Sequence, residues 1–278
     1  MHKEKRYLNI ACGSTFINDG VWTNIDFTSN SPSIKKADIL NGMPFKDNQF
    51  DVIYSSHFIE HIPKEDVFLF LKDVYRILKP GGLFRVISPD LEFLSLEYIS
   101  QYKNKNYLKA NFITSLILDQ CVRTRSGGQL QKDLESIHAS NNDEMISYVK
   151  ALVGADTFKE IELGRESFFN KVLRKIKQDP KFLFNIIFML RVMVVSAFLP
   201  KSFKNLNISN VSLGEKHQWL YDFNSLFEAL NEAKFVTIDR VEFNKTNYHN
   251  YIFENLDESN GFPRKGTHQL FIEAIKKL

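Results

Sequence analysis

Two histidines separated by three residues, with a glutamate beside the second, form the most reactive group of side chains in the sequence. The segment HFIEH runs from His57 to His61 and contains Glu60. Its spacing matches H-x-x-E-H, a pattern in which two histidines of one long helix bind zinc in metalloproteases. Here the segment begins where a strand is expected to end and Pro63 follows it, which disfavours a long helix. We therefore expect neither a protease nor a metal, although a divalent ion at His57, Glu60 and His61 stays an open alternative.

Small and acidic residues follow two further apolar runs. Ala11, Cys12 and Gly13 have side chains small enough for a ligand to approach the backbone closely. The turn lacks the pattern G-x-G-x-x-G, which disfavours a dinucleotide pyrophosphate. Asp26 ends the next run, where a carboxylate can accept both hydroxyls of a ribose. Asp38, after a third run, could accept the exocyclic amine of adenine, so these residues together indicate adenosine without phosphates.

Other polar residues have a functional and a structural interpretation. An imidazole can act as a general base near neutral pH, whereas helix capping or packing is the alternative for His57 and His61. Asp90 either binds an acceptor or caps the next helix. The remaining candidates are either acceptor contacts or loop residues, and they are His217, Trp219, Tyr221, Arg264, Lys265 and His268. Cys12 has no base at a fixed spacing, so packing is favoured over a nucleophilic role.

The candidate residues require strands that end at one edge of a sheet. Short apolar runs predict strands over residues 7–10, 22–25, 36–40, 52–54 and 83–88. Between Pro63 and Leu78 apolar residues recur at helical spacing, and Lys79-Pro80-Gly81-Gly82 ends this helix. Later in the chain, the sequence predicts a helix from Asp222 to Ala233 and strands over 235–243 and 269–275. This alternation is typical of a parallel sheet.

The middle of the chain has a different pattern, which we interpret as an insertion. From Phe93 to Glu215 the residues are helical, polar and irregular in pattern. Within it, Phe182 to Leu199 is almost entirely apolar, and Phe168 to Lys204 carries eight Lys or Arg against one Asp. The central Arg191 disfavours a membrane-spanning helix. Docking on an anionic membrane face, a buried lid helix and a dimer contact are the alternatives.

Composition limits the class of protein. The chain has 278 residues, of which 44% are hydrophobic and 25% charged, and these values are typical of a folded globular protein. The net charge of +3 is too small to imply a nucleic-acid partner. Two cysteines are too few for a disulfide framework, and the N-terminal residues do not resemble a signal peptide. We therefore expect a cytoplasmic protein.

A set of motifs in a fixed order gives the sequence a family resemblance. The motifs are LNIACG (Leu8 to Gly13), NID (Asn24 to Asp26), ADIL (Ala37 to Leu40), MPFKDNQFDVIYSSHFIEHI (Met43 to Ile62), LKPGG and FRVISPDLE (Leu78 to Glu92), HQWLYDFNSL (His217 to Leu226) and the closing FIEAIK. With them the chain resembles class I S-adenosylmethionine-dependent methyltransferases, and among these the bacterial enzymes of surface-polysaccharide (capsule or lipopolysaccharide) gene clusters. Asn9 and Ala11 stand where the family's opening motif has an acidic residue and its first glycine.

The resemblance implies a fold and a division of the chain. It implies an α/β protein with a Rossmann-like doubly wound sheet, mostly parallel with the last strand antiparallel, and a large helical insertion. Residues 1–95 and 215–278 would form the core that binds S-adenosylmethionine. Residues 96–214 would form the insertion, as an acceptor lid or as a membrane or dimer contact.

The resemblance also implies site residues. Catalytic roles would fall on His57, His61 and Asp90, and contacts with the acceptor on His217, Tyr221 and Arg264. Contacts with S-adenosylmethionine, and with its product S-adenosylhomocysteine, would come from Asn9, Ala11, Cys12, Gly13, Asp26, Phe27, Asp38, Ile39, Ser55 and Ser56.

The expected activity is methyl transfer to a small-molecule or glycan acceptor, at a sugar hydroxyl or a phosphate or phosphoramidate-type group. Expected partners are that acceptor, an anionic membrane at the inner face, and a second copy of the chain, with no nucleic acid. A catalytically silent module that binds the cofactor and recruits partners through the insertion is the alternative. An RNA methyltransferase is disfavoured because no basic stripe interleaved with aromatic residues is present.

Overall fold

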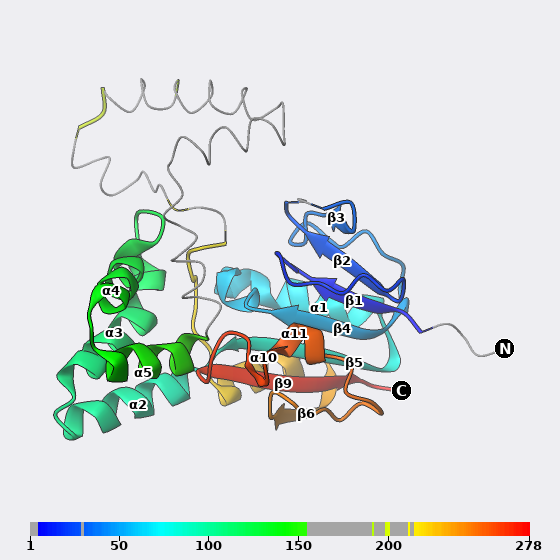
Figure 1. Cartoon of the computed structure of the whole chain (residues 1–278). Coiled ribbons are helices and arrows are strands. Elements are labelled where there is room, and N and C mark those ends of the chain that lie inside the picture. Colours follow the sequence, from blue (N-terminus) through cyan, green and yellow to red (C-terminus); the bar gives the residue numbers. More distant parts are fainter. Residues whose placement is uncertain (1–4, 29–30, 155–190, 192–197, 201–210, 212–213) are drawn as a thin grey trace.

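A seven-stranded sheet forms the centre of the molecule. The computed structural model describes residues 5–28, 31–154, 191, 198–200, 211 and 214–278. Within these residues the sheet has the order β3-β2-β1-β4-β5-β9-β6 (Figure 1). Its strands are β1 (Tyr7–Ile10), β2 (Trp22–Asp26), β3 (Ile34–Lys36), β4 (Phe50–Ser56), β5 (Leu78–Pro89), β6 (Phe235–Val241) and β9 (Gln269–Lys276). Strands β1 to β5 are parallel, and β9 is antiparallel to both β5 and β6. This topology confirms the predicted Rossmann-like sheet with an antiparallel last strand.

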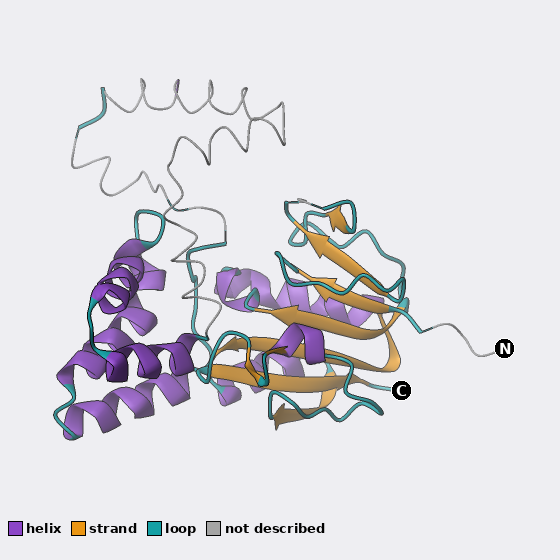
Figure 2. Ribbon diagram, viewed as in Figure 1, coloured by secondary structure: helices purple, strands orange, loops and turns teal. Residues whose placement is uncertain are grey.

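Helices cover the sheet and extend from one end of it (Figure 2). They are α1 (Val67–Ile77), α2 (Leu91–Lys103), α3 (Tyr107–Val122), α4 (Gly128–Ala139), α5 (Asp143–Val153), α10 (Phe223–Glu232) and the short α11 (Glu254–Asp257). Two 3-10 turns (Ile59–His61 and Lys64–Asp66) precede α1, and a small hairpin of β7 (Glu258–Ser259) and β8 (Phe262–Pro263) follows α11.

Two strands differ from their predicted bounds. Strand β3 ends at Lys36. The next residue, Ala37, still donates its N–H to Asp26 O at 2.9 Å, and the chain then leaves the sheet. The predicted strand over 36–40 is therefore wrong. Strand β5 begins at Leu78, which pairs with Phe50, and its register shifts before the pairing of Leu83 with Val52. The KPGG segment thus forms an irregularity within a strand, and the predicted start at Leu83 is too late.

Burial on both faces explains why the central strands are apolar. Every residue of β1 is buried, as expected for a parallel strand covered on two sides. On one face, α1 packs against the sheet with Leu71 and Val74, and α10 packs with Leu226. The helical spacing predicted for α1 is thereby confirmed. On the other face, Phe253 and Leu256 around α11 join the core.

The helices α2 to α5 form a separate layer beside the carboxyl ends of the parallel strands (Figure 1). Leu94, Ile113 and Val149 are buried among them. The end of α5 contacts the loop before β9, because the Thr267 N–H donates to Ala151 O at 3.0 Å. The part of the predicted insertion that the structure describes continuously, residues 96–154, is thus mainly helical. This layer lies beside the end of the sheet where a ligand is expected.

The apolar run from Phe182 to Leu199 and its basic flanks lie outside the described residues, apart from a few single positions. Among the helices that the structure does describe, none is both long and apolar enough to cross a membrane.

Candidate active site

Two residues with left-handed backbone follow β1 and β4. Ala11 has a φ of 53° and His57 a φ of 52°, which is uncommon for residues with a Cβ atom. The His57 N–H donates to Ile87 O at 2.8 Å, so the neighbouring strand holds this conformation. Strained residues of this kind cost roughly 1–3 kcal/mol each and cluster at functional sites. The two turns indicate where the sheet edge is shaped for a ligand.

A cavity of about 810 Å³ lies at these turns, within the range of roughly 300–1,000 Å³ that is usual for small-molecule sites. Ligands of open parallel sheets bind at the carboxyl ends of the strands, which is where this cavity is found. The predicted site residues that line it are Asn9, Ala11, Cys12, Gly13, Asp26, Phe27, Ser56, His57, His61 and Arg264. The structure thus brings residues of three separate motifs, together with Arg264 of the loop before β9, to one cavity.

Asp26 is oriented by backbone groups on both sides. The Gly13 N–H donates to its Oδ2 at 2.9 Å, and the Thr28 N–H donates to its Oδ1 at 2.9 Å. These bonds connect the turn after β1 with the end of β2. A carboxylate held in this way retains lone pairs for hydroxyl donors of a ligand.

Cys12 is buried beside Asp26. Burial, reinforced by the charge of Asp26, raises the pKa of the Cys12 thiol to about 12. The thiol is therefore protonated at neutral pH and is a poor nucleophile. This agrees with the packing role predicted for it.

Three residues predicted to contact the cofactor lie away from the cavity lining. Asp38 is exposed and accepts a hydrogen bond from Asn41 Nδ2 at 2.6 Å. Ile39 and Ser55 are buried in the interior. Because β3 ends two residues before Asp38, that carboxylate falls in a loop, and Leu40 lines the cavity instead. The geometry therefore does not support these three contacts.

Glu60 lies in the turn after β4, and three histidines surround it. His57 Nδ1 lies 3.3 Å and His61 Nε2 4.0 Å from Glu60 Oε1. The ring of His217 stacks edge-on against that of His61, with ring centres 4.8 Å apart. His217 does not line the cavity itself but lies behind His61.

The ionisation of this cluster is set mainly by burial. Burial alone would raise the pKa of Glu60, but the contact with His57 reverses this and lowers it to about 2. Burial and the charge of Lys265 lower the pKa of His57. Burial also lowers the pKa of His217 to about 3. Burial therefore favours the neutral form of the His57 and His217 imidazoles.

Asp90 and Tyr221 have structural positions. The Asp90 carboxylate accepts N–H bonds from Glu92 and Phe93 at the start of α2, and it also pairs with Arg240. Tyr221 is buried, and its carbonyl accepts the Leu91 N–H at 2.8 Å. Neither residue lines the cavity. Asp90 thus caps α2, as one of its two interpretations predicts, and its catalytic role stays a prediction.

Arg264 lines the cavity but its guanidinium also holds the neighbouring chain. It donates to Leu256 O at 3.2 Å and to Glu258 O at 2.7 Å. Lys265, which the sequence placed with it in a basic loop, lines the cavity as well. The loop before β9 therefore brings two cationic side chains to the cavity wall.

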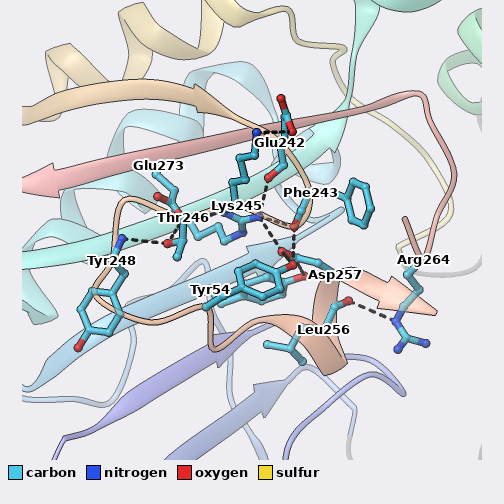
Figure 3. A network of polar contacts seen from close by, with 12 residues as sticks. Tyr54, Glu242, Phe243, Lys245, Thr246, Tyr248, Leu256, Asp257, Arg264 and Glu273 are labelled. Carbon is cyan, nitrogen blue, oxygen red and sulfur yellow. Dashed lines mark hydrogen bonds and ion pairs between the residues drawn. The ribbon is translucent and has the colours of Figure 1, made fainter. Parts of the chain in front are cut away.

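Sequence reasoning missed several lining residues, including Tyr54, Phe58, Leu256 and Gln269. Tyr54 lies within an apolar strand, so no pattern distinguished it from core residues. Its hydroxyl donates to Asp257 Oδ1 at 2.9 Å, and Arg85 pairs with the same carboxylate at 2.7 Å. Arg85 is fully buried and also pairs with Glu273 at 2.6 Å. Figure 3 shows Tyr54 beside Asp257 in this network. This network anchors the segment around α11, which forms one wall of the cavity.

Comparisons with known proteins agree with this geometry. Residues 21–86 match a family model described as a methyltransferase domain. No curated protein matches the chain. Residues 21–86 are thus similar to a methyltransferase domain, and the strand order of the sheet is the one expected for the Rossmann-like fold.

Three solved structures that resemble the chain are S-adenosylmethionine-dependent methyltransferases. One from Methanosarcina mazei has 14% identity and a TM-score of 0.42, with 99% of this chain and 94% of that chain covered. One from Archaeoglobus fulgidus has 13% identity and a TM-score of 0.39, with 98% and 86% covered. One from Mesorhizobium loti has 19% identity and a TM-score of 0.25, with 31% of this chain covered. The chain spans about half of the Mesorhizobium loti structure, at 47%.

Proposed function

We propose that this protein transfers the methyl group of S-adenosylmethionine to an oxygen of a small-molecule or glycan acceptor in surface-polysaccharide biosynthesis. The observation that carries the proposal is the single cavity that joins Asp26 to His57, His61 and Lys265. Asp26 ends β2 and His57 follows β4, with β1 between these strands, so the two groups stand apart along the sheet edge. One part of the cavity can hold a nucleoside while the other receives an acceptor.

The reaction requires positioning and a proton acceptor. The acceptor oxygen attacks the methyl carbon in line with the sulfur, so the O–CH3 bond forms as the S–CH3 bond breaks. Sulfur keeps the electron pair and leaves as S-adenosylhomocysteine, and a hydroxyl acceptor gives its proton to a base. His57 and His61 lie at the cavity wall where such a proton would be lost, and an acceptor that is already an oxyanion needs only alignment. The cationic loop of Arg264 and Lys265 favours an acceptor that carries negative charge.

We also propose that the enzyme works in the cytoplasm, near the inner membrane face or as a homodimer. The support is the charge of the segment Phe168 to Lys204, which carries eight Lys or Arg against one Asp.

The test is methyl transfer from labelled S-adenosylmethionine to three separate fractions: soluble sugar nucleotides, lipid-linked glycans and structured RNA. We expect label in one of the two glycan fractions, and none in RNA. The matched control is His249→Gln, which changes an exposed histidine outside the cavity and should label as the wild type does. Binding of the cofactor without transfer to any fraction would instead support a catalytically silent module.

A further inference from the structure

The buried carboxylate of Glu60 is the least satisfied polar group near the cavity. Its side chain has no exposed surface, and among the described residues neither oxygen has a hydrogen-bond partner. His57 Nδ1 approaches Oε1 to 3.3 Å, but without hydrogen-bond alignment. A buried charge is stable only when donors, a counter-charge or a metal compensate it. Without aligned hydrogen bonds His57 compensates the charge only in part, so the carboxylate can take a further partner.

Histidine side chains from two distant segments converge on this carboxylate. One ligand atom each of Glu60, His61 and His217 lies within 4.8 Å of the other two. His61 Nδ1 faces Lys216 O at 2.9 Å and donates its proton there, so its Nε2 lone pair remains on the side of Glu60. Hydrogen bonds of this kind, from the other ring nitrogen to a carbonyl, orient metal-binding histidines.

His217 has a nitrogen available for the same ion. Its Nε2 contacts the side-chain amide of Gln120 at 3.1 Å, and among the described residues its Nδ1 has no partner. Rotation of this amide by 180° places its oxygen against Nε2–H and leaves the Nδ1 lone pair free. The Gln218 N–H donates to Glu60 O at 2.7 Å, which ties the two segments together. The cluster is thus held by backbone bonds and does not depend on the side chains alone.

We propose that Glu60, His61 and His217 bind a divalent transition-metal ion. Two imidazoles and one carboxylate are a ligand set for zinc, iron(II), manganese or cobalt, whereas magnesium and calcium prefer oxygen ligands alone. Ligand atoms about 2.1 Å from a tetrahedral zinc ion lie about 3.4 Å from one another, so atoms now within 4.8 Å approach one another by up to about 1.4 Å when the ion binds. The H-x-x-E-H pattern suggested His57 as the second histidine ligand, but the structure places His217 there and leaves His57 to orient Glu60.

The place of the ion relative to the cavity gives it a function, and this step rests on the proposed methyl transfer. His61 lines the cavity, whereas Glu60 and His217 lie behind it. Three protein ligands leave one coordination position free, as in catalytic zinc sites. An acceptor hydroxyl at that position has a lower pKa and loses its proton more readily.

The first experiment measures binding directly. Untagged full-length protein is stripped with a chelator, dialysed against zinc, and analysed for bound metal by mass spectrometry. We expect about one zinc ion per chain in the wild type and in the control His249→Gln. Glu60→Gln and His217→Gln should abolish stoichiometric binding, and His57→Gln should weaken it about 10- to 100-fold as an orienting residue does. Cobalt absorption spectra of the same variants report the ligand set without any assay of activity.

The outcomes separate this proposal from the proposed function. Circular dichroism of the stripped proteins shows which variants remain folded, and His57→Gln provides a second readout if His217→Gln does not fold. A folded wild type that retains no zinc, or a Glu60→Gln protein that binds it as the wild type does, overturns the metal site. Full methyl transfer by stripped protein overturns the role of the ion and leaves the function standing. Stoichiometric zinc without transfer to any acceptor supports the site and contradicts the function.

Discussion

Asp26 and Asp38 have similar positions in the sequence but different environments in the structure. Asp26 lines the cavity and accepts backbone N–H groups from Gly13 and Thr28. Asp38 is exposed outside the cavity lining. A hydroxyl that donates to a carboxylate forms a charge-assisted bond, which is stronger than a bond between neutral groups.

We therefore expect Asp26→Asn to weaken S-adenosylmethionine binding by about 1.5–3 kcal/mol, the range for a hydrogen bond to a charged group. Asn retains an oxygen for the Gly13 N–H, so the turn should stay folded. Isothermal titration calorimetry measures the change, with Asp38→Asn as the matched control that should bind as the wild type does. Equal affinities of the wild type and Asp26→Asn would remove Asp26 from the cofactor site.

His268 is a buried titratable residue outside the Glu60 cluster. Its Nδ1 lies 2.7 Å from Leu152 O and donates to it. Burial, assisted by the nearby His57, lowers the pKa of His268 to about 4. Between pH 4 and 6.5 the unfolded chain therefore holds a proton on His268 that the folded protein does not. The free energy of unfolding must rise with pH across this window.

His268→Gln should make this pH dependence less steep, by up to about 1.4 kcal/mol per pH unit, because one proton is no longer taken up on unfolding. Urea denaturation at several pH values between roughly 4.5 and 7.5 measures how steeply the free energy of unfolding changes with pH. This range covers most of the interval between the folded and unfolded pKa values of His268. His249→Gln, which alters an exposed histidine, should keep the slope of the wild type. If the free energy of unfolding changes with pH equally steeply in the wild type and in His268→Gln, the pKa of His268 is not lowered in the folded protein.

At the scale of elements, the end of α5 and the loop before β9 approach each other through two glycines. Gly154 has a φ of 85° and Gly266 a φ of 84°. A Cβ atom on Gly266 would lie 2.1 Å from Leu152 O, and one on Gly154 would lie 2.3 Å from Arg264 O. The contact joins the helical layer to the loop that carries Arg264 and Lys265.

Gly266→Ala should destabilise the protein by more than about 1–3 kcal/mol, because it combines an unfavourable φ with a clash against backbone. Thermal and urea unfolding measure the loss. Gly261 has a φ of 78°, and a Cβ atom there would meet no atom within 4 Å. The control Gly261→Ala should therefore lose only the stability that the unfavourable φ costs. A Gly266→Ala protein as stable as Gly261→Ala would show that the two elements separate readily.

The sequence predicts elements well where local pattern and packing agree. The buried stripe of α1 and the helix predicted from Asp222 to Ala233, found as α10, both follow from the pattern. The antiparallel β9, which the family resemblance implied, is also found. The predicted bounds of β3 are wrong because β2 pairs with residues 34–36 and not with the apolar residues beyond Lys36. The local pattern does not contain this pairing. The contact between His61 and His217 could not be predicted, since it depends on where the chain returns after the insertion.

At the scale of the whole molecule, charge is distributed unevenly along the chain. The net charge is +3, and the segment Phe168 to Lys204 contributes 8 − 1 = +7, so the rest contributes 3 − 7 = −4. Basic segments of this kind bind anionic lipid surfaces, with about 1 kcal/mol for each Lys or Arg near the surface.

We expect the protein to bind vesicles that contain anionic lipids at low ionic strength and to dissociate as salt is added. Flotation assays measure binding. A variant with Gln in place of Lys171, Arg174, Lys175 and Lys177 should lose it, whereas a control with Gln at the exposed Lys72, Lys103, Lys105 and Lys132 should retain it. If the wild type ignores such vesicles, the segment is better explained as a lid or a dimer contact.

Strand β9 has a consequence for the order in which the chain can fold. It lies between β5 and β6, yet it follows both of them in the sequence. Its Lys276 also donates to Tyr75 O and Leu78 O, where α1 passes into β5. During synthesis, β5 therefore waits with an unpaired, apolar edge until residues 269–276 leave the ribosome. Such edges pair readily with other chains. A nascent chain stalled before β9 should thus require a chaperone, and the strand that completes the sheet is inserted between β5 and the edge strand β6.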